Sequence, residues 1–178
     1  MSTRLSRAIS RFRRSEAGNA TIEFAITFPA VMMLLLSGIE LAMSSLQHAM
    51  LERAMDMTVR DIRLGTGTSP QHDEIKDLLC ERAGFIDNCS TNMRLQMVEV
   101  DPRNWNWAGG AAQCVDHAED AEPVIEFKQD AAENALMVLR ACAKIDPIFP
   151  TTGLGAAMKG DDGQYSLVSI SAFVQEPR

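Results

Sequence analysis

The chain has 178 residues and a formal net charge of -7, which leaves room for about one domain with an additional element. The charge is unevenly distributed: residues 1–18 carry five arginines and one glutamate, a net +4, so residues 19–178 carry a net -11. An acidic body repels phosphate, which argues against nucleic acid as a partner. A basic segment directly before an apolar run is instead typical of a membrane protein whose N-terminus stays in the cytoplasm.

Residues 19–64 are predicted to form one long helix, because glycine and proline occur only once each in them. The stretch Phe24–Ile39 has no charged residue and lies between Glu23 and Glu40. Sixteen residues are short for a bilayer core of ~30 Å, which needs about 20 residues, but uncharged neighbours extend the stretch on both sides. The membrane anchor is therefore predicted to occupy roughly residues 19–46, with 1–18 as a cytoplasmic leader.

The second half of this helix is predicted to be amphipathic. Apolar residues follow steps of three and four, apart from a gap at Asp61, and form one stripe that we expect to pack on the rest of the protein. Its members are Ile39, Met43, Leu46, Met50, Ala54, Met57 and Leu64.

Residues 71–178 are predicted to form a periplasmic globular α+β domain beyond a helix-breaking cluster at 65–70. Ser69 and Pro70 would cap a short helix that ends at Gly84. Alternating strands are then expected around residues 93–97, 125–127, 137–145 and 168–174.

Because each strand has one apolar face, we expect an antiparallel sheet covered on one side by the amphipathic half of the long helix. In the last strand the apolar set is Val168, Ile170, Ala172 and Val174. A helix over residues 131–143 is the alternative to the third strand, since Ala, Leu and Met favour that state.

Four cysteines, Cys80, Cys89, Cys114 and Cys142, all follow the apolar run. An even number in an exported segment suggests two disulfides, and four cysteines allow three connectivities. We favour Cys80–Cys89 with Cys114–Cys142, because the first pair closes a short local loop. Four buried free thiols are the alternative.

The junction between leader and anchor carries the most specific signal. It reads Arg13-Arg14-Ser15-Glu16-Ala17-Gly18-Asn19-Ala20-Thr21-Ile22-Glu23-Phe24. In a secretory signal the apolar region precedes a small-residue cleavage site, whereas here Gly18 precedes the apolar region. A cut after Gly18 would leave the anchor on the mature chain, with Glu23 as its fifth residue. This arrangement resembles type IV prepilins.

The resemblance is sharpest to the TadE-like family, over roughly residues 14–60. Its elements fall in register at Gly18, Glu23, Phe24, Pro29, Gly38 and Glu40. The distal residues match no motif, and their predicted helix and strands are compatible with a pilin-like head. Pro29 is expected to kink the span, and Glu40 is interpreted as marking the periplasmic interface rather than as a second pairing carboxylate.

The resemblance implies a minor pilin or pseudopilin of a Tad (tight adherence) pilus, TadE and TadF both remaining open. It implies cleavage between Gly18 and Asn19 by a prepilin peptidase, and subunit assembly through Glu23, Phe24 and Pro29. In the family, the new amine, here at Asn19, and the carboxylate of Glu23 neutralise each other within or between subunits. The implied location is the inner membrane, in a single pass, with incorporation in the pilus left open.

The resemblance also implies the partners. They are the prepilin peptidase, the major Flp pilin, a second minor pilin, the inner-membrane assembly platform and membrane lipid. It implies neither enzymatic activity nor a cofactor, and the cysteines show no metal-binding spacing.

Other features of the distal region have weaker interpretations. An acidic cluster at residues 116–120 is more consistent with a solvated loop than with a cation site. Trp105 and Trp107 would either form a contact patch on an exposed loop or pack under the edge of the sheet. The competing functional class is a signal-anchored periplasmic enzyme or sensor domain, which predicts an uncleaved leader and a polar pocket. A pilus-independent envelope protein is the third, and neither has a motif in its favour.

Overall fold

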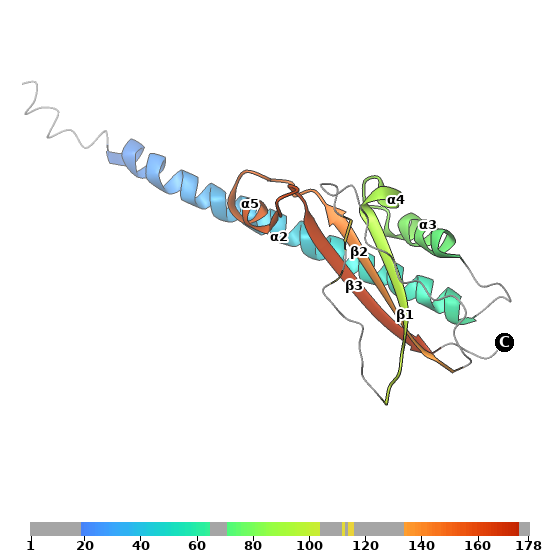
Figure 1. Cartoon of the computed structure of the whole chain (residues 1–178). Helices are drawn as coiled ribbons and strands as arrows, with labels where there is room; N and C mark the ends of the chain where they lie inside the picture. Colours follow the sequence, from blue (N-terminus) through green and yellow to red (C-terminus); the bar gives the residue numbers. More distant parts are fainter. Residues whose placement is uncertain (1–18, 65–70, 104–111, 113, 116–133, 175–178) are drawn as a thin grey trace, which may run out of the picture.

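The computed structural model describes residues 19–64, 71–103, 112, 114–115 and 134–174. Its elements are α2 (Asn19–Leu64), α3 (His72–Ala83), α4 (Cys89–Asn92), β1 (Met93–Val100), β2 (Leu136–Ile145), α5 (Gly153–Met158) and β3 (Tyr165–Val174). We call everything described beyond α2 the head. Figure 1 shows the N-terminal part of α2 (blue) standing clear of the head and its C-terminal part lying against it. The expected α+β arrangement of one long helix with a small antiparallel sheet is confirmed.

The two halves of α2 have different surroundings. Every side chain from Ala20 to Val31 is exposed. In the C-terminal half, Leu51, Ala54 and Met55 are completely buried against the head. The N-terminal half of α2, which we call its bare half, is therefore not covered by the head, whereas the C-terminal half is packed against it.

The prediction that the apolar stripe of α2 packs on the head is wrong. Only Ala54 of its seven members is buried, and the other six are 37–63% exposed. The face against the head instead includes the polar residues Glu40, Ser44 and Thr58, all buried. The hydroxyl of Ser44 donates to the carbonyl of Leu41, and that of Thr58 to the carbonyl of Ala54. Hydrophobic periodicity misses a face on which polar groups are buried with their own hydrogen-bond partners.

The core lies between the sheet and the two longer helices, α2 and α3. Removing its aliphatic, aromatic and methionine side chains from water supplies the main driving force for folding. The members of the core include Leu51, Met55, Ile75, Leu79, Met93, Leu95, Met137, Leu139, Tyr165 and Phe173.

The sheet has the order β1-β2-β3, with both neighbouring pairs antiparallel. Leu95, Ala141 and Ser169 are aligned across it. The predicted apolar faces of β1 and β2 are confirmed, because Met93, Leu95, Met97 and alternate residues from Met137 to Ile145 are buried in the core.

The predicted apolar face of β3 is wrong. Tyr165 and Phe173 point into the core, and the set of Val168, Ile170, Ala172 and Val174 occupies the opposite face. Ile170 is 51% exposed and Val174 45% exposed. The small Ser169 and Ser171 lie on the helix-facing side, which leaves room for α2 to approach this strand.

The second face of the sheet is also partly covered, contrary to expectation. Val138, Arg140 and Cys142 of β2 are buried on that face. Cys142 is joined to Cys114, and Val115 beside it is buried as well. The helical alternative for residues 131–143 is wrong over 136–143, which belong to β2.

The short helix predicted before Gly84 is confirmed as α3. Its N-cap is Gln71 rather than Ser69: the backbone N–H of Gln71 donates to the carboxylate of Glu74, 3.0 Å away. Gly84 has φ 64°, the left-handed conformation that glycine adopts at a helix C-terminus. Ser69, Pro70 and the strand expected at 125–127 lie outside the described residues.

Candidate functional site

The residues singled out for subunit assembly lie on the bare part of α2. Gly18 is outside the described residues, and Asn19 is the first residue of the helix. Glu23, Phe24 and Pro29 follow within three turns, all exposed. Phe24 stacks on Phe28, with ring centroids 5.0 Å apart. The structure therefore presents Glu23, Phe24 and Pro29 together on one segment that the head does not cover.

Helix α2 is long and apolar enough to cross a membrane, judged by length and composition, and it lies near the N-terminus. No residue of its most apolar stretch is buried. Bare hydrocarbon surface of this extent requires lipid or another apolar partner. The helix fits a single-pass membrane anchor.

The second carboxylate of α2, Glu40, has a structural role that sequence reasoning missed. Its side chain is 1% exposed. Its Oε1 accepts a hydrogen bond from the backbone N–H of Ile148 at 3.1 Å, and its Oε2 accepts one from the N–H of Phe149 at 2.9 Å. Hydrogen bonds to a charged acceptor are stronger than neutral ones. Glu40 thus fastens the β2–α5 connection to the helix.

Neighbouring contacts depend on small residues. The hydroxyl of Ser37 accepts a hydrogen bond from the N–H of Leu154 at 3.2 Å. A Cβ added at Gly155 would lie 2.5 Å from the carbonyl oxygen of Phe149 and 3.2 Å from Oε2 of Glu40. Glycine at this position therefore allows α5 to approach closely enough for Glu40 to reach the backbone of the connection.

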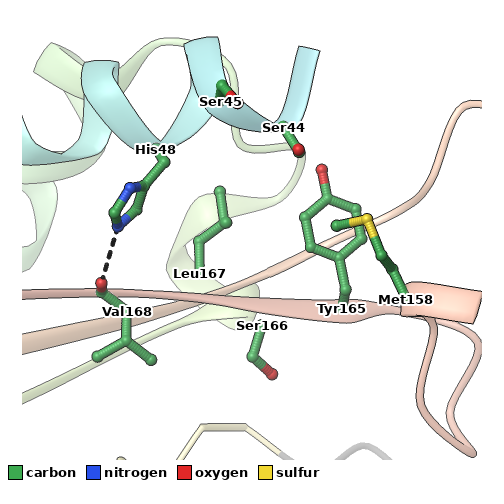
Figure 2. Close-up of a pocket in the computed structure, with 8 residues that line it drawn as sticks. All are labelled: Ser44, Ser45, His48, Met158, Tyr165, Ser166, Leu167 and Val168. Carbon is green, nitrogen blue, oxygen red and sulfur yellow. Dashed lines mark hydrogen bonds between the residues drawn. The ribbon is translucent and has the colours of Figure 1, made fainter. Parts of the chain in front are cut away.

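A groove of ≈ 410 Å³ lies beside this contact, between α2, α5 and β3 (Figure 2). His48 Nε2 lies 3.1 Å from the carbonyl oxygen of Val168, and this contact ties α2 to β3. The hydroxyl of Tyr165 donates to Oε1 of Gln47 at 2.6 Å. The groove is lined by Ser44, Ser45, His48, Met158, Tyr165, Ser166, Leu167 and Val168.

Three polar side chains of this groove have hydrogen-bond partners within the protein, and two of them, His48 and Tyr165, connect α2 to β3. Ser44, His48 and Tyr165 each hydrogen-bond to the main chain or to a neighbouring amide rather than to one another. Burial raises the pKa of Tyr165 above its ordinary value of 10.0, and the negative charge of Glu40 raises it further. The neutral hydroxyl of this tyrosine is the hydrogen-bond donor to Gln47.

Two disulfides stabilise the head. Cys80 at the end of α3 is joined to Cys89 at the start of α4, and Cys114 is joined to Cys142 of β2. These are the two pairs that the sequence analysis favoured. Disulfides persist in oxidising compartments, as in the periplasm.

The described part of the chain contains no group of three or more His, Cys, Asp or Glu side chains that could hold a metal ion. The acidic cluster at 116–120 and the tryptophans Trp105 and Trp107 lie outside the described residues. Lys144 and Asp162 form an ion pair near the start of β3, and the hydrogen bond from Lys144 lowers the pKa of Asp162.

One family model matches part of the chain. A model of the family described as TadE-like protein matches residues 18–60, which include Glu23, Pro29 and Glu40 and almost all of α2. No match was found to a curated protein or to a solved structure. The last four residues of α2 and the whole head are outside the matched segment. Over residues 18–60 the chain therefore carries the signature of the TadE-like family.

Proposed function

We propose that this chain is a minor pilin or pseudopilin that takes part in assembly of a Tad (tight adherence) pilus. The TadE-like match indicates a pilus-associated protein, from a family of pilus components rather than of enzymes. The finer role rests on the exposed carboxylate of Glu23 on α2 and on the positively charged partner that this carboxylate needs in a membrane.

The observation that carries the proposal is the exposure of Glu23 on an otherwise apolar segment. All residues from Ala20 to Val31 are exposed, and Glu23 is the one charged residue among them. A carboxylate within hydrocarbon is costly unless it is paired. Cleavage after Gly18 would create a positive amine at Asn19, four residues away, on the same or a neighbouring chain. Glu23 is suited to hold one subunit in register with the next.

A second exposed surface supports contact between subunits. Ile39, Met43, Leu46, Met50 and Met57, from the stripe that the head leaves uncovered, are 37–53% exposed. They extend the apolar surface of the span along the side of the head. A neighbouring helix of another subunit would cover this surface by apolar contact.

The proposed topology follows from charge. The basic leader, residues 1–18, stays in the cytoplasm by the positive-inside rule. The helix crosses the inner membrane within residues 19–46, and the region from 71 to 178 lies in the periplasm. The prepilin peptidase removes the leader, and the mature chain joins the major pilin, a second minor pilin and the assembly platform.

The test is whether surface pili depend on this chain. Cells that lack it are expected to lose surface pili, and the full chain supplied in trans is expected to restore them, counted by electron microscopy. A signal-anchored enzyme or sensor would leave pilus number unchanged, so normal piliation without the chain would refute the proposal.

A further inference from the structure

The connection between β2 and β3 contains an uncharged segment that lies against α2 at the end of the head. Residues 147–158, which we call the base loop, read Pro-Ile-Phe-Pro-Thr-Thr-Gly-Leu-Gly-Ala-Ala-Met and lie between Asp146 and Lys159. Ile148 is 47% exposed, Pro150 and Ala157 are exposed, and Phe149 is half-buried. This is an apolar surface that the head itself does not cover.

The base loop attaches to α2 where the helix leaves the head. Its anchoring contacts run from Ile148 and Phe149 to Glu40, and from Leu154 to Ser37. Figure 1 shows α5, the helical part of this loop, at the end of the head nearest the bare half of α2. On the helix at this level, Leu34 is 76% and Leu41 57% exposed. The exposed apolar side chains of the base loop therefore lie at the same level along the helix as exposed leucines of α2.

The distance along α2 from its first residue to the base loop matches the thickness of a bilayer core. From Asn19 to Glu40 the helix rises about 31 Å at 1.5 Å per residue, close to the ~30 Å of a hydrocarbon core. If Asn19 lies at the cytoplasmic edge of the core, Glu40 and the base loop lie at the opposite edge. The loop is followed by the charged residues Lys159, Asp161 and Asp162, of which Lys159 and Asp161 are exposed.

We propose that the base loop inserts into the lipid headgroup and acyl boundary of the outer leaflet, so that the head rests on the membrane at a fixed height. Apolar side chains beside a polar rim are the arrangement that binds a bilayer interface. The hydrogen bonds from the N–H groups of Ile148 and Phe149 satisfy Glu40 at the depth where lipid would leave a carboxylate without water. The proposal depends on α2 being the anchor and not on a role in pili.

The test uses the full chain in phosphatidylcholine vesicles, with and without bromine on the acyl chains. Ile148→Trp places an indole on the base loop, and Ile170→Trp is the matched control, since Ile170 is 51% exposed on the outer face of β3. The parent chain, with Trp105 and Trp107, supplies the background emission. We expect brominated lipid to quench the indole introduced at 148, and its emission to shift to shorter wavelength, while that at 170 is unaffected.

Equal quenching at the two positions would overturn the proposal. A shift to shorter wavelength at 148 without quenching by bromine would also overturn it, because that result indicates a protein contact in place of lipid. If Ile148→Trp prevents folding, as judged by protease resistance of the head, Ala157→Trp on the exposed side of α5 replaces it with the same expected outcomes.

Discussion

The carboxylate of Glu40 accepts a hydrogen bond from the backbone N–H of Phe149, 109 residues later in the chain, at 2.9 Å. Its other oxygen accepts one from Ile148. This side chain, at the end of the apolar run, therefore ties the β2–α5 connection to the helix.

Removing this carboxylate should loosen the head. Glu40→Ala leaves two N–H groups without their charged acceptor, and hydrogen bonds to charged groups contribute about 1.5–3 kcal/mol each. We expect the free energy of unfolding to fall by about 2 kcal/mol or more, measured by thermal or denaturant unfolding in detergent. Glu52→Ala is the control, because Glu52 is exposed on the same helix and should change stability by less than about 0.5 kcal/mol. Equal effects of the two substitutions would show that the Glu40 contacts contribute little.

The ionisation of Tyr165 should report the charge of Glu40 directly. The chain has a single tyrosine, so ultraviolet absorbance of tyrosinate gives its pKa without ambiguity. Burial raises this pKa above 10.0, and the negative charge of Glu40 adds to the rise. Glu40→Gln removes the charge, and we expect the pKa of Tyr165 to fall towards 10.0 while staying above it because burial remains. Glu52→Gln should leave it unchanged, and an unchanged pKa in Glu40→Gln would show that the charge of Glu40 does not act on Tyr165.

Glu23→Ala should separate membrane insertion from assembly. Loss of one partner of a buried ion pair is typically worth ~3–5 kcal/mol, whereas removing a carboxylate from the span favours insertion. We expect the variant to accumulate in the inner membrane and to be processed, but not to support surface pili. Glu52→Ala, on the same helix beyond the span, should retain piliation. Normal pilus counts with Glu23→Ala would remove the role assigned to this carboxylate.

Processing should depend on the size of residue 18. We expect mass spectrometry of membrane-extracted protein to show a chain that begins at Asn19. Gly18→Ala should be largely tolerated and Gly18→Leu should block cleavage through steric exclusion at the peptidase. An intact Met1–Gly18 segment on assembled protein would exclude prepilin processing.

The two disulfides should differ in their contribution to stability. Chain-entropy arguments give about 2.5 kcal/mol for the Cys80–Cys89 loop and about 3.5 kcal/mol for the longer Cys114–Cys142 loop. The double alanine variant of the second pair should therefore unfold at lower denaturant concentration than that of the first. Alkylation of native protein without reductant should label no cysteine. Four labelled thiols would contradict both bonds and weaken the periplasmic assignment.

Several features of this protein follow from local sequence. The long helix follows from 46 residues with one proline and one glycine, and the strands from period-two alternation, because both signals depend on near neighbours. Gly18, Glu23 and Pro29 lie at fixed spacings along the chain, so the family resemblance could be found without a structure. The two disulfide pairs could be favoured because Cys80 and Cys89 are nine residues apart.

Other features depended on which surfaces meet in three dimensions. Only the tertiary structure shows that α2 packs through Glu40, Ser44 and Thr58, leaving Met43 and Leu46 exposed. It also shows that the apolar set of β3 faces away from the helices. The physical reason is that a buried polar group needs a specific partner, and for Glu40 that partner is backbone more than 100 residues away. Composition and periodicity describe one segment at a time, whereas pairing between distant segments is decided by packing.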